Sequence, residues 1–307
     1  MRPVKGESPS GGIQADAQAD SDAAQFGPIT AREAALAAAA LGASGGGTHA
    51  AELLSLLYDD TVESSDILRS LRSEPTLASR VLRVANSSYY RRAGAVGTLE
   101  RALQVLGLAS LRGIAAVGCM DRIPVPTVGS VLDERQFRRH SIAVAAGTQA
   151  LCKRCGAGIE AESFIAGLLH SLGIVVLARL RPPAAAALAA LPPMPPASIR
   201  QAEVDLWGID HATASEILAR EWKLPIWLSS ALRADVTEDY TPRTGTDVLP
   251  DLLAIGEYCA REAGFGLWVS SIAAPTPERI AVLGLGATDC DEVIAELPEQ
   301  VQMLCGN

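Results

Sequence analysis

The sequence predicts an all-α protein. Of its 307 residues, 49% are hydrophobic but only 4% are aromatic, and much of the apolar content is alanine. That composition favours closely packed helices over aromatic-rich sheets. Apolar residues recur at helical spacing, with capping residues where several of these segments begin. Because no segment shows the period-two alternation that is typical of strands, we expect a multi-helix bundle.

Residues 1–46 predict a disordered N-terminal arm. They are rich in Gly, Ser, Asp, Gln and Ala and contain almost no bulky apolar residue. Burial of so little apolar surface cannot offset the loss of chain entropy. We expect at most a transient alanine-rich helix near 31–41, followed by a flexible hinge at Gly45, Gly46 and Gly47.

From Thr48 onward the pattern is helical. Thr98, Asp133 and Asp210 each precede an apolar segment and predict helix N-caps, while Gly107 and Gly208 predict turns. The main helices are expected over 99–106, 108–120, 133–156, 160–169, 174–180, 198–208, 211–222, 226–232, 249–263, 276–284 and 289–304. The last three of these helices would form a C-terminal helical extension, residues 246–307, that packs on the preceding domain.

Composition and charge limit the classes of function. The net charge is -9, which argues against a nucleic-acid-binding surface over the whole molecule. Neither an apolar leader nor an alanine-rich run long enough to span a bilayer is found, so we expect no membrane partner. Six scattered cysteines form no dense framework and indicate reduced thiols. We expect a cytoplasmic location.

Three histidines stand at landmarks of the predicted helices. His140 lies within the long helix, His170 follows the apolar run 164–169, and His211 opens the helix after Asp210. Gly173 predicts the end of the helix that carries His170. Three histidines from three helices can hold a metal, but buried histidines that are hydrogen-bonded within a core fit the same spacing.

Several short motifs, taken together and in order, resemble the HDOD domain, the HD-related output domain of bacterial signalling proteins. The similarity covers roughly residues 48–245. The motifs are Leu82–Ser87, Leu103–Leu111, Arg139–Ser141, Ala166–Gly173, Gly208–His211 and Trp222–Pro225. The resemblance implies a helical fold like that of HD and HD-GYP metal-dependent phosphohydrolases.

The resemblance also implies that the catalytic metal centre of those relatives has degenerated here. Where active relatives carry a His-Asp pair, this chain has His170-Ser171, and a hydroxyl neither offsets a cation's charge nor bridges two metals. The histidine pair expected after Trp222–Pro225 is also missing. We therefore expect neither metal nor other cofactor, with His140, His170, His211 and Asp210 as a vestigial set. Their three rings should cluster without a shell of carboxylates.

The leading hypothesis is accordingly a non-catalytic regulatory module that binds other signalling proteins. Two alternatives remain: a residual mononuclear phosphohydrolase acting on a nucleotide or phosphoester, and a nucleotide-binding sensor without turnover, with cyclic dinucleotides as ligands to test. A candidate interaction surface comprises Asn86, Ser87, Tyr89, Arg91 and Arg92, although Asn86 and Ser87 also suit the turn between two helices.

Overall fold

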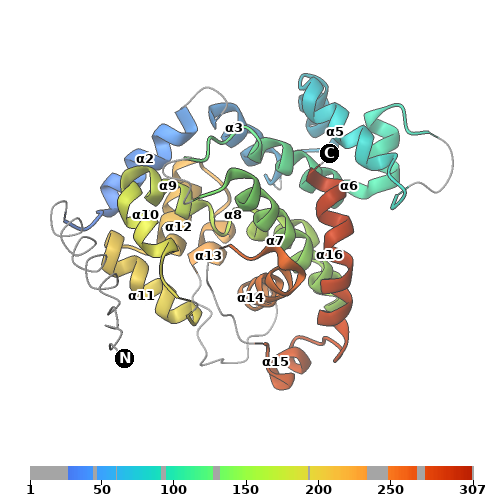
Figure 1. Ribbon diagram of the computed structural model, residues 1–307. Coiled ribbons are helices and arrows are strands. Elements are labelled where there is room, and N and C mark those ends of the chain that lie inside the picture. Colours follow the sequence, from blue (N-terminus) through green and yellow to red (C-terminus); the bar gives the residue numbers. More distant parts are fainter. Residues whose placement is uncertain are drawn as a thin grey trace, which may run out of the picture.

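The computed structural model describes residues 27–43, 47–59, 61–90, 95–126, 132–192, 194–233, 248–267 and 274–305. Within these residues the chain is helical and has no strand, which confirms the predicted all-α class (Figure 1). The helices are α2 (Ala31–Ala43), α3 (Gly47–Leu57), α4 (Ser64–Arg72), α5 (Pro75–Ala85), α6 (Leu99–Met120), α7 (Glu134–Cys155), α8 (Glu160–Leu169), α9 (Leu172–Leu180), α10 (Pro182–Ala189), α11 (Pro196–Trp207), α12 (His211–Glu221), α13 (Ile226–Arg233), α14 (Leu249–Ala260), the π-helical turn η3 (Arg261–Phe265), α15 (Pro277–Val282) and α16 (Asp289–Cys305).

Helix α7 forms the centre of the bundle and packs against α8, α14 and α16 (Figure 1). Its N-cap is Asp133, whose carboxylate accepts a hydrogen bond from the Gln136 amide at 2.6 Å, as the sequence predicts. Small residues allow the neighbours to approach closely. A Cβ added to Gly167 of α8 would lie 2.6 Å from the Cα of Ala145, so the backbones of α7 and α8 are nearly in contact there.

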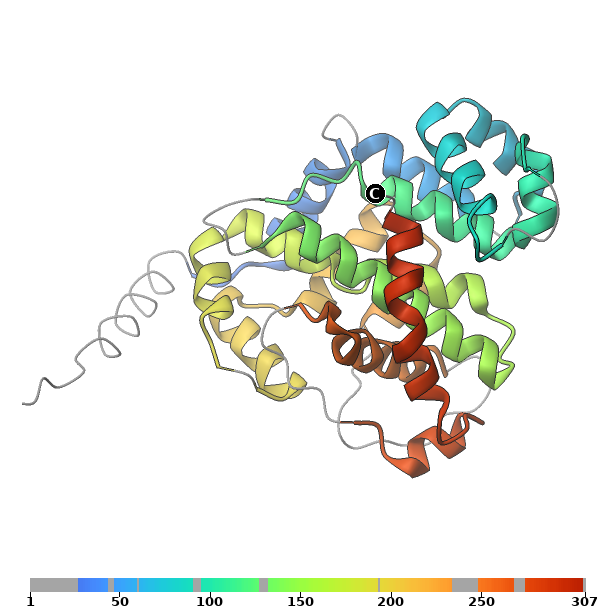
Figure 2. The ribbon, with the colours of Figure 1, turned by 45° about the vertical axis from the view of Figure 1, so that its right-hand side comes forward.

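The C-terminal segment is built into this core. Helix α14 contacts both α7 and α8, and α16 runs across α7 (Figure 2). A Cβ on Gly256 would lie 2.2 Å from the Thr148 Oγ1 of α7, so this glycine permits the close approach of α14. Helices α14 and α16 of the C-terminal segment therefore pack on α7 at the centre of the molecule.

The prediction of a disordered arm is wrong for residues 27–43. Helix α2 contacts α3, α9 and α12, and Ala34, Ala38 and Leu41 on it are fully buried. The Trp222 indole donates a hydrogen bond to the Ala38 carbonyl at 3.1 Å. Each alanine buries little area, so the composition of this segment alone does not predict a stable helix. Contacts with α3, α9 and α12 stabilise α2 instead. Residues 1–26 lie outside the described part of the chain.

Two glycine predictions had different outcomes. Gly107 interrupts α6 with a φ of 77°, so the predicted turn between two helical segments is confirmed. Gly173 does not end a helix. Helix α8 ends at Leu169, the chain turns at His170 and Ser171, and Gly173 lies in the first turn of α9. A Cβ there would lie 2.1 Å from the His211 carbonyl oxygen, so Gly173 permits α9 and α12 to touch.

Two helical stretches of the described residues, Leu99–Met120 and Glu160–Leu180, are long and apolar enough to cross a membrane by those criteria alone. In the fold, 56% and 89% of these two windows are buried. Core helices pass the same test, and burial of the second stretch identifies it as a core segment.

Candidate functional site

His140 projects from the middle of α7 into the interior, where it is 3% exposed. Its Nδ1 lies 2.9 Å from the carbonyl oxygen of Phe265, in the turn that follows α14. A carbonyl can only accept, so Nδ1 carries the proton and the neutral ring presents the lone pair of Nε2.

His170 occupies the break between α8 and α9 and is 7% exposed. Its Nδ1 lies 2.7 Å from the Gly167 carbonyl oxygen, so this ring also donates through Nδ1. The break is held by Ser215 of α12, whose hydroxyl donates to the His170 carbonyl at 2.8 Å and accepts from the Gly173 amide at 2.9 Å. The Gly167 carbonyl therefore orients the His170 ring, and Ser215 holds the backbone that carries it.

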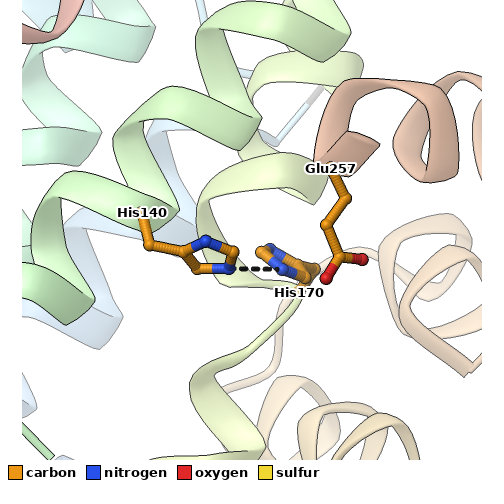
Figure 3. A group of neighbouring side chains, drawn as sticks. All are labelled: His140, His170 and Glu257. Atoms are coloured by element: carbon orange, nitrogen blue, oxygen red, sulfur yellow. Dashed lines mark hydrogen bonds between the residues drawn. The ribbon is translucent and has the colours of Figure 1, made fainter. Parts of the chain in front are cut away.

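The two rings meet through their Nε2 atoms, which lie 3.2 Å apart (Figure 3). Burial, and to a smaller extent the adjacent His170, lower the pKa of His140 to about 3. Burial also lowers the pKa of His170, although Glu257 opposes that effect. Both rings are therefore neutral at pH 7, and two lone pairs face each other.

Glu257 of α14 reaches toward the two rings (Figure 3). One carboxylate oxygen of Glu257 and one ring nitrogen from each histidine all lie within 4.8 Å of one another. The sequence predicts three clustered rings without a shell of carboxylates, whereas the structure places one carboxylate, that of Glu257, beside His140 and His170. Sequence reasoning missed Glu257 because it lies in the C-terminal extension. The sequence did contain a signal: Glu257 is a charged residue between the apolar residues Ile255 and Cys259 of a predicted helix.

His211 lies on the wall of the same pocket but is paired elsewhere. Its Nδ1 lies 2.7 Å from Oε2 and 2.8 Å from Oε1 of Glu203, and Oε2 also accepts a hydrogen bond from the His211 amide at 2.9 Å. Burial alone would lower the pKa of His211, but the Glu203 carboxylate outweighs it and raises that pKa. Asp210 serves as the N-cap of α12, accepting from the Thr213 amide at 2.7 Å. The structure thus separates His211 and Asp210 from the two facing histidines.

A pocket of about 520 Å³, partly open to solvent, borders this cluster. Its polar lining consists of His140, His170, Ser171, Glu203, His211 and Glu257, and its apolar lining of Ile174, Leu188, Leu191, Met194, Ile199 and Leu267. Ser171 is 2% exposed, and its hydroxyl has no hydrogen-bond partner among the described residues. The pocket therefore combines apolar walls with three histidines and two carboxylates.

The residues of the predicted interaction surface differ in their roles. Asn86 connects the end of α5 to the following loop: its amide donates to the Leu82 and Val96 carbonyls, and its carbonyl accepts from the Val96 amide, each at 2.8 Å. This role is structural. The Ser87 hydroxyl lies 3.2 Å from the Met303 sulfur, whereas Tyr89 is 51% exposed. Arg91 and Arg92 lie outside the described residues.

Comparison with known proteins identifies a family and a shared fold. Residues 48–236 match the model of the HDOD domain. Similar solved structures include a candidate phosphohydrolase from Shewanella amazonensis SB2B, at 22% identity and a TM-score of 0.62, covering 84% of this chain and 92% of that one. No curated protein matches the chain.

Two further structures have TM-scores of 0.64. A candidate signal transduction protein from Marinobacter aquaeolei VT8 is 24% identical, with 84% of this chain and 57% of that one covered. An HDOD domain protein with unknown function from Geobacter sulfurreducens is 20% identical, with 83% of this chain and 89% of that one covered. At these identities the likeness establishes the fold. Glu257 lies beyond the segment that matches the family model.

Proposed function

The chain belongs to the HDOD family, and we propose that it is a non-catalytic regulatory module of bacterial signal transduction, working in the cytoplasm by binding other proteins. One observation carries the non-catalytic part of this proposal, namely the chemical make-up of the pocket. The name of the Marinobacter protein, a candidate signal transduction protein, supports the setting.

The pocket offers little to a phosphoester. Among the described residues that line it there is no lysine or arginine, and half of its twelve lining side chains are apolar. Phosphoryl transfer requires cationic groups or metal pairs that neutralise the charge of the transferring group. With Ser171 in place of a carboxylate and Glu203 already paired with His211, Glu257 is the carboxylate left for a cation.

The proposed contacts with partners use exposed apolar side chains, which proteins commonly bury when they bind one another. Ile226 is 84% exposed at the start of α13, directly after the Trp222–Pro225 motif, and Tyr89 is 51% exposed. The net charge of -9 favours basic or neutral partners over nucleic acid.

The catalytic half of the proposal is tested with a generic phosphodiester such as bis(p-nitrophenyl) phosphate. The full chain is assayed with added Mn²⁺ or Zn²⁺ beside His170→Ala. We expect both proteins to hydrolyse the substrate at the rate of the metal alone. Metal-dependent turnover that disappears in His170→Ala would overturn the proposal.

The partner half is tested by quantitative capture from the native cell, comparing wild type with Ile226→Ser. Val282→Ser is the matched control, because Val282 is also exposed, at 47%, but lies on α15. We expect a defined set of signalling proteins to be depleted from the Ile226→Ser sample and retained by the control. Equal capture by all three proteins would rule out the Ile226 surface.

A mononuclear metal-dependent phosphohydrolase is the second candidate. The observation that favours it is the group of His140, His170 and Glu257 on the border of an open pocket. The same phosphodiesterase assay decides between the two candidates.

A further inference from the structure

The hydrogen bonds of the two facing histidines determine where their protons lie. Both Nδ1 atoms are held by backbone carbonyls, Phe265 for His140 at 2.9 Å and Gly167 for His170 at 2.7 Å. Since a neutral imidazole has a single N–H, both Nε2 atoms carry lone pairs. These lone pairs face each other across 3.2 Å and repel unless something positive lies between them.

Two species can fill that role, a shared proton or a metal ion. A shared proton would make one ring an imidazolium, in a site where His140 is 3% and His170 7% exposed. A metal ion is bound by the neutral rings as they stand. Two ligand atoms on a tetrahedral Zn²⁺ stand roughly 3.3 Å apart, and the observed separation of the Nε2 atoms agrees with that value.

The surroundings are those of a metal ligand set. Metal-bound histidines commonly donate their other ring N–H to a backbone carbonyl, which sets the tautomer and the ring direction. Glu257 adds a carboxylate within 4.8 Å of both ring nitrogens. We propose that His140, His170 and Glu257 together bind one divalent transition-metal ion.

The donor set indicates the class of metal. Two imidazoles and one carboxylate suit Zn²⁺ or Fe²⁺, whereas Mg²⁺ and Ca²⁺ favour all-oxygen shells. The set contains one carboxylate, so it suits a single ion. This inference goes beyond the regulatory proposal and does not depend on it, because a bound ion can act as a structural element or a sensor without turnover.

Metal content and thermal unfolding of the full chain test the proposal. The protein is stripped with EDTA, dialysed, and titrated with Zn²⁺, with Co²⁺ as a spectroscopic probe and with Mg²⁺ as the comparison. We expect about one equivalent of Zn²⁺, a rise in Tm with Zn²⁺ but not with Mg²⁺, and Co²⁺ absorption bands typical of four- or five-coordination.

Glu257→Gln is the decisive variant, because it keeps the size of the side chain and replaces a partly buried residue. Its matched control is Glu262→Gln, which changes an exposed acid five residues on, paired with Arg261. We expect Zn²⁺ affinity to fall roughly 100-fold in Glu257→Gln and to be unchanged in the control. His140→Gln and His170→Gln should abolish uptake, and circular dichroism checks that each variant is folded.

Two outcomes would overturn the proposal. One is a stripped wild-type protein that takes up no Zn²⁺, Co²⁺ or Fe²⁺ and shows no change in Tm, which would leave the two rings sharing a proton. The other is equal Zn²⁺ affinity in wild type and Glu257→Gln, which would remove Glu257 from the ligand set. Uptake of metal without phosphodiesterase activity would support this inference and leave the regulatory proposal intact.

Discussion

Glu203 holds His211 through both of its carboxylate oxygens, which lie 2.8 and 2.7 Å from Nδ1, and it also accepts the His211 backbone amide. Glu203 is 1% exposed, and His211 donates the hydrogen bonds that its buried carboxylate accepts. The pair joins α11 to the start of α12, and both of its side chains line the pocket.

Replacing His211 by Gln should produce a pH-dependent loss of stability in the metal-free protein. The folded pKa of His211 is raised above its ordinary value of 6.5 because Glu203 outweighs burial. Stabilisation by the charged ring is therefore complete below pH 6.5 and is lost as the pH rises through the folded pKa. Urea unfolding at several pH values should show that His211→Gln lowers the free energy of unfolding most at acidic pH and least at alkaline pH. A cost that is independent of pH would contradict the ion pair.

Replacing Gly256 by Ala should force α14 away from α7. The added Cβ would lie 2.2 Å from Thr148 Oγ1, 2.9 Å from its amide nitrogen and 3.1 Å from its Cα, so backbone must move. We expect a loss of about 1–3 kcal/mol in the free energy of unfolding. Zn²⁺ affinity should fall as well, because Glu257 is the next residue. Gly97→Ala is the control, since a Cβ there meets nothing within 4 Å.

Leu41 and Leu36 test whether α2 belongs to the folded core. Leu41 is fully buried, and Leu41→Ala should lower the free energy of unfolding by about 2–5 kcal/mol. Leu36, on the same helix, is 63% exposed, and Leu36→Ala should change it by less than about 0.5 kcal/mol. Equal, small effects in urea denaturation would mean that α2 is not packed in solution.

Asn86→Ala should destabilise the protein although Asn86 contacts no ligand site. The change removes three hydrogen bonds to Leu82 and Val96 and leaves a partly buried amide and two carbonyls without these partners. We expect a loss of about 1–3 kcal/mol, measured by thermal unfolding. Gln104→Ala, which removes a hydrogen bond from Arg101 on an exposed surface, should have little effect. A similar, small loss in both variants would indicate that the Asn86 contacts are not needed.

The sequence alone determined the helical class, most helix ends and the family. These properties are local: the spacing of apolar residues records which face of a helix is buried, and Asp133, Gly107 and Asp210 act on backbone within one turn of themselves. The likeness to HDOD domains rests on short motifs of the same kind.

Only the tertiary structure decided the composition of the site. Glu257 lies near His140 and His170 because α14 packs closely on α7 at Gly256. His211 is hydrogen-bonded to Glu203 instead of to these two rings. Helix α2 is likewise ordered by the surfaces it covers rather than by its own propensity. Contacts between residues far apart in the chain depend on how the helices pack. The local patterns of a single sequence do not predict which helices become neighbours.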